Sequence, residues 1–272
     1  MTIMRTRLLN PTAIATFIVA TTSLCIGASI RDDFNDGNDN GWAHYEPLAP
    51  FGAPASFSFP GGAYRIQASA SPDPSGFGFG RAGSMRLDQG FVNFAIDFDL
   101  LSWNNGLNQS FGILGRASNI GFGTTDGYAF TYSTAGSIGI WLVVNDRMTA
   151  LASASISLDP ATHYHFSFGA AGRVLSGDVV DDLHRPVGFV QSLDTTYSSG
   201  ATGFYLFSNT NDGTVDATFD NYFAGEVPEP SIWSLLVLGG TGLACSAVRK
   251  RRSRPAERNQ QTHIDPHLNS NS

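Results

Sequence analysis

The sequence predicts an all-β protein, built as a two-sheet antiparallel sandwich between two apolar terminal segments. The chain of 272 residues contains 30 glycines, 13 prolines, 20 phenylalanines and 8 tyrosines, but only 14% of its residues are charged. Strong helix formers are rare, since glutamate occurs four times and lysine once, whereas aromatic residues favour strands. Apolar and polar residues alternate with a period of two through the body of the chain, between Ile30 and Gly225. A β-helix is the rival fold, but no fixed-period repeat supports it.

The first 29 residues have the layout of a secretory signal peptide. Arg5 and Arg7 form a basic start, and an uncharged, mostly apolar stretch follows and ends in small residues. This order is typical of export signals, and it predicts cleavage after Ala28 or Ser29. An uncleaved membrane anchor is the alternative.

Period-two alternation then marks a series of short strands in the body. Around Phe91–Leu100, for example, Val92, Phe94, Ile96, Phe98 and Leu100 share one face, and Asn93, Asp97 and Asp99 share the other. Turn residues such as Asn145-Asp146 separate the strands. Runs of this kind recur at 57–68, 91–100, 110–114, 126–132, 137–144, 147–157, 164–168, 204–207 and 215–223. Their spacing favours a sandwich of about a dozen strands.

A second apolar run, residues 231–248, contains no charged side chain and is followed directly by a basic cluster. Eighteen helical residues at ~1.5 Å each span about 27 Å, which is enough to cross a bilayer core. The sequence therefore predicts a single C-terminal transmembrane helix, with the basic cluster on the cytoplasmic side.

The residues around this run resemble the PEP-CTERM sorting signal of exported bacterial proteins. A Pro-Glu-Pro triplet, an apolar span and an arginine-rich cluster follow one another over residues 226–252. The matching positions are Val227, Pro228, Glu229, Pro230, Arg249, Lys250, Arg251 and Arg252. The resemblance implies processing by a membrane-embedded exosortase, display at the cell surface, and an association with exopolysaccharide and biofilm matrix. The chain departs from the family in its polar tail, residues 253–272, whose composition predicts disorder.

The body, residues 30–225, resembles the concanavalin A-like (laminin-G-like) jelly-roll superfamily. The resemblance rests on the order of three short segments, 32–42, 192–203 and 217–223. It implies that the first and last strands pair side by side. Members of the superfamily are glycan-binding lectins, glycoside hydrolases or adhesive modules.

The composition of the body excludes several functions. Both cysteines, Cys25 and Cys245, lie in the terminal segments, so the body has no disulfide and no thiol nucleophile. Eight arginines against eighteen aspartates and one glutamate give residues 30–225 a net charge of −11. Such a surface disfavours nucleic acid and suits divalent cations.

Calcium is the cofactor that the acidic turns suggest. Residues 36–41 repeat the first six positions of a calcium-binding loop, but Pro47 stands where the final bidentate acid is expected. The superfamily resemblance implies a structural calcium near the paired termini, which points to Asp33, Asp36 and Asp220. The alternative is a turn rich in Asp and Asn without an ion.

The body lacks the residues of a typical glycoside hydrolase. Its single glutamate, Glu46, excludes the Glu-x-Asp-x-x-Glu strand of the superfamily's hydrolases. Asp97 and Asp99 lie two apart, about 7 Å, so they could form a carboxylate pair, but a solvated strand face is favoured. His163 and His165 share a strand face without an identifiable third metal ligand. We therefore expect no catalysis.

Sugar binding relies on aromatic rings and amide side chains. Trp103, next to Asn104 and Asn105 in an expected loop, is the candidate stacking platform, whereas Trp42 and Trp141 are expected in the core. The sequence thus predicts an exported, surface-sorted protein that binds extracellular polysaccharide without cleaving it. The alternatives are a structural or adhesive matrix protein without sugar recognition and, more weakly, a diverged hydrolase that uses Asp97 and Asp99.

Overall fold

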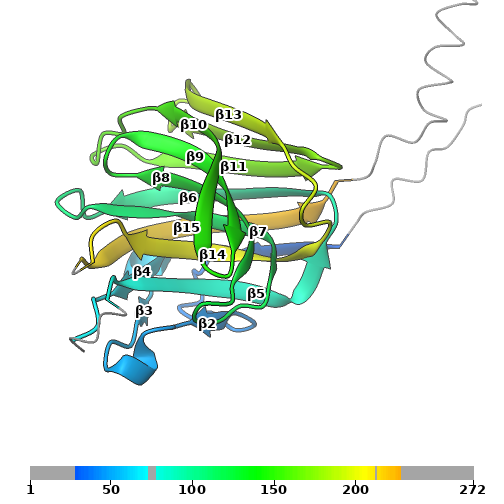
Figure 1. Ribbon diagram of the computed structural model, residues 1–272. Coiled ribbons are helices and arrows are strands. Elements are labelled where there is room, and N and C mark those ends of the chain that lie inside the picture. Colours follow the sequence, from blue (N-terminus) through cyan, green and yellow to red (C-terminus); the bar gives the residue numbers. More distant parts are fainter. Residues whose placement is uncertain (1–27, 73–77, 212, 228–272) are drawn as a thin grey trace, which may run out of the picture. The chain divides into compact units, whose positions relative to one another are not determined.

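The computed structural model describes residues 28–72, 78–211 and 213–227 (Figure 1). Nearly all of the expected signal peptide, the apolar run 231–248 and the tail 253–272 lie outside the described residues. In the part of the chain that the structure does describe, no helix is long and apolar enough to cross a membrane.

The described residues form a sandwich of two antiparallel sheets, as the alternation predicts (Figure 1). The eight-stranded sheet has the order β13 (Pro186–Leu193), β12 (Val174–Asp181), β11 (Tyr164–Ala171), β6 (Phe94–Trp103), β15 (Val215–Glu226), β4 (Tyr64–Ala68) and β3 (Ser56–Ser58), with β1 (Ser29–Asp32) also paired to β15. The seven-stranded sheet has the order β10 (Arg147–Ser155), β9 (Ser137–Val144), β8 (Asp126–Ser133), β7 (Gln109–Ser118), β14 (Gly200–Ser208), β5 (Arg81–Phe91) and β2 (Ala43–Tyr45). Helical structure in these residues is limited to two 3₁₀ turns, η1 (Ala49–Phe51) and η2 (Pro60–Gly62).

The first and last described strands pair side by side, as the superfamily resemblance implies. In β1, Ser29 pairs with Gly225 and Asp32 pairs with Tyr222 of β15. Beyond β1, the indole Nε1 of Trp42 donates a hydrogen bond to Asp32 Oδ2 at 2.8 Å. Trp42 is 9% exposed and packs in the core, so its expected core position is confirmed.

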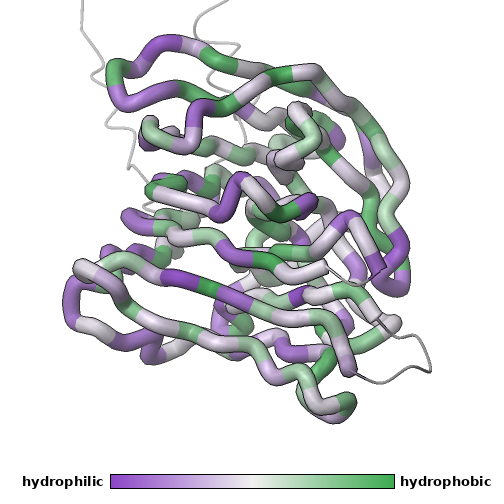
Figure 2. Tube along the Cα trace, turned by 90° about the vertical axis from the view of Figure 1, so that its left-hand side faces the viewer, coloured by the Kyte–Doolittle hydropathy of each residue, from purple (hydrophilic) through white to green (hydrophobic). Residues whose placement is uncertain are grey.

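The core lies between the two sheets and is dominated by aromatic rings. Figure 2 shows the alternation of hydrophobic and hydrophilic residues along the strands that produces it. Phe204 of β14 stacks on Phe219 of β15 with ring centroids 4.4 Å apart, which joins one sheet to the other. It also contacts the rings of Phe34, Trp42, Tyr64, Phe98 and Tyr222.

The strand predicted at Phe91–Leu100 begins later than its pattern suggests. Strand β6 starts at Phe94, and Val92, assigned to the buried face by its spacing, lies in the preceding turn and is 47% exposed. The reason is that Asn93 is buried in this turn, where its Oδ1 accepts a hydrogen bond from the Gly172 N–H at 2.8 Å. By contrast, the turn expected at Asn145-Asp146 is confirmed, because both residues adopt positive φ angles (50° and 61°), as a two-residue hairpin requires.

Candidate functional site

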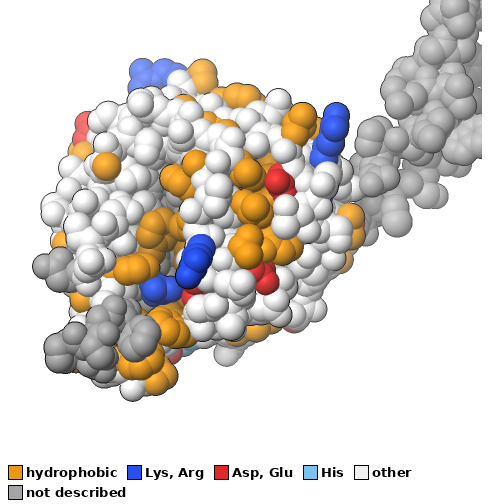
Figure 3. Space-filling view, in the orientation of Figure 1, with side chains coloured by type: hydrophobic (Ala, Val, Ile, Leu, Met, Phe, Trp, Pro, Cys, Tyr) orange, Lys and Arg blue, Asp and Glu red, His pale blue; other side chains and the backbone are white. Residues whose placement is uncertain are grey.

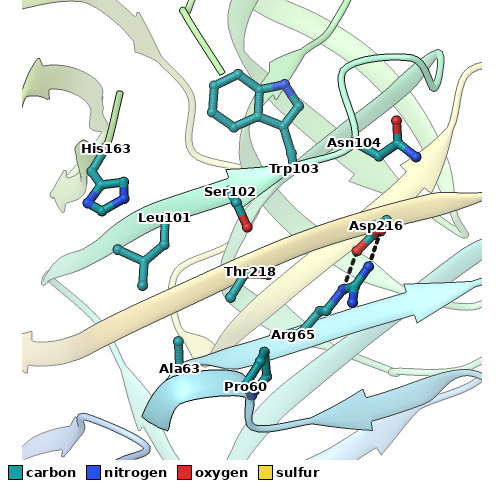
Figure 4. Close-up of a pocket in the computed structure, with 10 residues that line it drawn as sticks. All are labelled: Pro60, Ala63, Arg65, Leu101, Ser102, Trp103, Asn104, His163, Asp216 and Thr218. Atoms are coloured by element: carbon teal, nitrogen blue, oxygen red, sulfur yellow. Dashed lines mark hydrogen bonds and ion pairs between the residues drawn. The ribbon is translucent and has the colours of Figure 1, made fainter. Parts of the chain in front are cut away.

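A surface hollow of about 520 Å³ lies on the outer face of the eight-stranded sheet (Figure 4). Strands β4, β15 and β6 form its floor, and η2 and the residue before β11 form its sides. Of the ten side chains that line it, four are apolar, two form an ion pair and four are other polar side chains. The ten are Pro60, Ala63, Arg65, Leu101, Ser102, Trp103, Asn104, His163, Asp216 and Thr218.

The charged pair in this hollow is Arg65 of β4 and Asp216 of β15. Arg65 Nε lies 2.8 Å from Asp216 Oδ1, and Arg65 Nη2 lies 2.6 Å from Oδ2, so the contact is bidentate (Figure 4). The guanidinium side chain remains 39% exposed, whereas that of Asp216 is 14% exposed. The pair therefore presents a guanidinium edge to solvent above a neutralised carboxylate.

Gln109, at the start of β7, holds the floor of the hollow from below. Its side chain is completely buried, and its Nε2 donates to the backbone oxygens of Asn104 (2.9 Å) and Asp216 (3.1 Å). Its Oε1 accepts a hydrogen bond from the Asp216 N–H at 2.7 Å. A buried amide that satisfies three backbone groups fixes this loop relative to β15, so the hollow is organised without a ligand.

Trp103 is not the exposed stacking platform that its neighbouring asparagines suggest. The residue is 7% exposed, ends β6 rather than lying in a loop, and packs against Phe111, Tyr132 and Tyr164. The cause is a β-bulge: Ser102 pairs with Thr218 while Leu100 pairs with Phe219, so one extra residue lies between them in β6. An extra residue reverses the alternation and turns Trp103 into the core.

The two asparagines after Trp103 have different roles in the structure. Asn105 Oδ1 accepts a hydrogen bond from Trp103 Nε1 at 3.1 Å, which holds the indole in place. Asn104 lines the hollow together with part of Trp103. The structure thus brings Trp103 and Asn104 to one hollow and adds Arg65 and Asp216, which lie far from them in the sequence and carry no motif of their own.

Asp97 and Asp99 lie on the outer face of β6, beside His165 of β11. His165 Nδ1 lies 2.9 Å from Asp99 Oδ1, and His165 Nε2 lies 3.6 Å from Asp97 Oδ1. Ser167 Oγ also donates to Asp97 (2.6 Å), and Asn221 Nδ2 donates to Asp99 (2.7 Å).

These contacts set the charges of the cluster. Partial burial opposes ionisation of Asp97 and Asp99, but the interactions with His165 and the other donors outweigh it and lower the pKa of both carboxyls. Conversely, the interactions with Asp97 and with Asp99 raise the pKa of His165 to about 9. A glycosidase needs one carboxyl with a raised pKa to act as general acid, and this pair does not supply one.

The residues expected to hold calcium lie at the paired termini. Asp33 Oδ1 accepts a hydrogen bond from the Asn35 N–H (3.3 Å), and Asp220 Oδ1 accepts one from the Asn221 N–H (2.7 Å). Asp36 similarly caps the Asn38 N–H, as in an Asx turn. Among the described residues, no group of three or more His, Cys, Asp or Glu side chains is placed to hold a metal ion. Calcium binding at Asp33, Asp36 and Asp220 stays a prediction.

Comparison with known structures identifies the fold as the jelly roll of lectins. A lectin UEA-II, solved in complex with galactose, superposes with a TM-score of 0.52 at 9% identity, over 74% of this chain and 98% of that chain. Lectin II from Ulex europaeus gives a TM-score of 0.51 at 9% identity, with the same coverage. A protein of unknown function with a galectin-like fold from Bacillus subtilis gives 0.50 at 10% identity, over 74% of this chain and 96% of that chain. At such identities the likeness concerns the fold alone.

The C-terminal part of the chain carries a recognised signal. Residues 226–252 match the PEP-CTERM protein-sorting motif, which confirms the resemblance seen in Pro228-Glu229-Pro230 and the basic cluster. None of the curated proteins matches the chain. The protein therefore combines a lectin-like jelly roll with a PEP-CTERM sorting motif.

Proposed function

We propose that this is an exported protein that is sorted to the cell surface and binds extracellular polysaccharide without cleaving it. The sorting motif at 226–252 supports processing by an exosortase-type enzyme, with the chain held transiently in the membrane through residues 231–248. The lectin-like fold supports sugar binding by the domain that precedes the motif.

The observation that carries this proposal is the hollow around Arg65 and Asp216. Its described lining residues supply hydroxyl, amide, guanidinium and carboxylate groups that are already held in place, which is the chemistry that recognises sugar hydroxyls. Among those residues Asp216 is the only carboxylate, and both of its oxygens contact Arg65. A second carboxylate for hydrolysis is therefore missing from the lining, which favours binding without catalysis.

A glycan array with the purified protein tests the proposal, run with calcium and with excess EDTA. We expect binding to a defined class of polysaccharide, and loss of that binding in Arg65→Gln. Arg147→Gln serves as a control, because Arg147 is exposed on β10 of the other sheet. A folded protein that binds nothing in either condition would contradict the proposal.

A structural or adhesive matrix protein is the second candidate, and exposed apolar side chains favour it. Leu183, Phe189 and Leu193, in and next to the edge strand β13, are 67%, 58% and 58% exposed. Apolar side chains also gather on the molecular face displayed in Figure 3. Such surfaces support protein contacts. Cell aggregation that depends on Phe189 and Leu193, without any glycan binding, would favour this candidate.

A further inference from the structure

We propose that the binding surface is a continuous groove that accepts an internal stretch of an extended, uncharged polysaccharide, centred on the Arg65–Asp216 pair. This inference rests on the proposed function and specifies its ligand class. It depends on three features of the described residues: the continuity of two hollows, the charge balance of their lining, and the hydrogen-bonding groups at the point where they meet.

The hollow around Arg65 continues into a second one of about 360 Å³. Asn104 and Asp216 line both hollows, so the two meet at the Arg65–Asp216 pair. The second hollow extends over β4 to Ser56 of β3, whereas the first extends to His163, next to β11. Since neighbouring strands lie about 4.8 Å apart, a groove that crosses from β11 over β6, β15 and β4 to β3 is about 19 Å long. That length exceeds a single sugar ring and suits several linked units.

The lining of the groove carries balanced charge. Arg65 neutralises Asp216 through two short contacts. Apart from His163, the other side chains that line the two hollows have no ionisable group. A charged amine on the ligand would need a carboxylate without a cationic partner, and both carboxylate oxygens of Asp216 already contact Arg65. An acidic polysaccharide would approach a body with a net charge of −11, which repels it over a distance set by the ionic strength. An uncharged polysaccharide needs no free carboxylate in the groove and is not repelled by the negative charge of the body.

The junction of the hollows can bind neighbouring hydroxyl groups. Arg65 uses Nε and Nη2 toward Asp216, so Nη1 is left to donate to a ligand, and the side chain is 39% exposed. The carboxylate oxygens of Asp216 retain lone pairs that can accept from a hydroxyl. A donor and an acceptor fixed side by side match two adjacent hydroxyls of a sugar ring, each of which both donates and accepts. Because Gln109 fixes Asp216 from below, little ordering is needed when the ligand binds.

Calorimetric titration of the purified full chain, kept in mild detergent, tests this inference. The probes are uncharged gluco-, manno- and galacto-oligosaccharides of increasing length, with uronate oligosaccharides of equal length beside them at low and high salt. We expect affinity for one uncharged series to rise with length until the groove is filled, and no binding of uronates at low salt. Arg65→Gln should weaken binding by about tenfold or more, as expected for loss of a charge-assisted hydrogen bond.

Two further variants separate the features of the groove. Gln67→Ala, in the second hollow, should weaken long oligosaccharides and leave short ones unchanged, which tests the continuity. Arg147→Gln on the other sheet should change nothing, and unchanged melting temperatures would show that the variants are folded. Tighter binding of uronates, or affinity that does not depend on length, would overturn the inference while the proposed function stands. An unaffected Arg65→Gln variant would overturn the inference and would also remove the hollow around Arg65 as the site of the proposed function. Absence of binding to every glycan would overturn both.

Discussion

His165 lies between two carboxylates on the outer face of the eight-stranded sheet, with Nδ1 2.9 Å from Asp99 Oδ1 and Nε2 3.6 Å from Asp97 Oδ1. These charge interactions connect β11 to β6, in addition to the antiparallel backbone pairing of the two strands. It also makes the stability of the domain depend on pH.

We predict that stability falls between about pH 6.5 and pH 9 and that His165 causes part of the fall. The folded-state pKa of His165 is raised to about 9, mainly by Asp97 and Asp99, whereas an unfolded histidine has a pKa near 6.5. A raised folded pKa stabilises the fold below the unfolded value, and this contribution is lost as the pH rises through the folded value. Because the side chain is 39% exposed, solvent screening limits the effect to about 1 kcal/mol or less. Thermal unfolding at pH 6.5 and 9.5 should show a smaller loss in His165→Gln than in the wild type, and equal losses would contradict the prediction.

We also predict that the protein releases no sugar from polysaccharides to which it binds. Asp97 and Asp99 both have a lowered pKa, so both are ionised near neutral pH and neither can protonate a leaving group. A reducing-end assay between pH 5 and pH 8 should give the same background for the wild type and for Asp97→Asn. Sugar release that disappears in Asp97→Asn, with melting temperature unchanged, would restore the hydrolase alternative.

Much of this fold is readable from the sequence because buried and outward residues alternate along several strands of the eight-stranded sheet. In β6 and β11 the buried residues Phe98 and Phe166 and the outward residues Asp97 and His165 follow the period of two. Other strands lack this alternation of buried and outward residues. Strand β5 is a mixture of small and polar residues, so alternation does not indicate it. In β12 the inward position 177 is a glycine, because the ring of Phe130 fills the space that a side chain would need there.

The site is harder to predict than the fold. Trp103 and Asn104 are recognisable as an aromatic residue next to an amide, but the bulge in β6 that turns the indole inward has no signature in the sequence. Arg65 and Asp216 are 151 residues apart and meet only because β4 pairs with β15. Pairing between distant strands depends on the whole sheet, so a single sequence does not reveal it.

Phe204 should be among the most costly core positions to truncate. It is completely buried and contacts aromatic rings of the opposite sheet, including Phe219 at 4.4 Å. We expect Phe204→Ala to lower the free energy of unfolding by about 3–5 kcal/mol, since the cavity adds to the loss of buried area. Phe189→Ala is the matched control, because that ring is 58% exposed and its removal should change stability by about 0.5 kcal/mol or less. Chemical unfolding of both variants measures the difference, and similar values would contradict this account of the core.

We predict that calcium binds at the acidic turns near the paired termini and raises the melting temperature of the protein. Burial raises the pKa of Asp220, and the nearby charges of Asp99, Asp33 and Asp32 add to the shift. A divalent cation would relieve this repulsion, and binding to the folded state alone stabilises it by mass action. Melting curves in calcium and in EDTA should differ for the wild type and coincide for Asp33→Asn combined with Asp36→Asn. Identical curves for the wild type would show that these turns form without an ion.

The sorting motif and the jelly roll should be separable. The strands and core residues that the structure describes all lie before Pro228, whereas the matched motif covers residues 226–252. We predict that a chain ending at Val227 keeps the same melting temperature and the same glycan affinity but is released from the cells that produce it.

A full-length chain with alanine at positions 228–230 is the second variant, since it retains the apolar run and the basic cluster while removing the triplet on which the motif depends. Fractionation of cells and medium should find this variant held in the membrane and unprocessed. If both altered chains reach the cell surface as the wild type does, residues 226–252 do not direct sorting in this protein. If the shortened chain loses glycan affinity, recognition involves residues beyond the described sandwich.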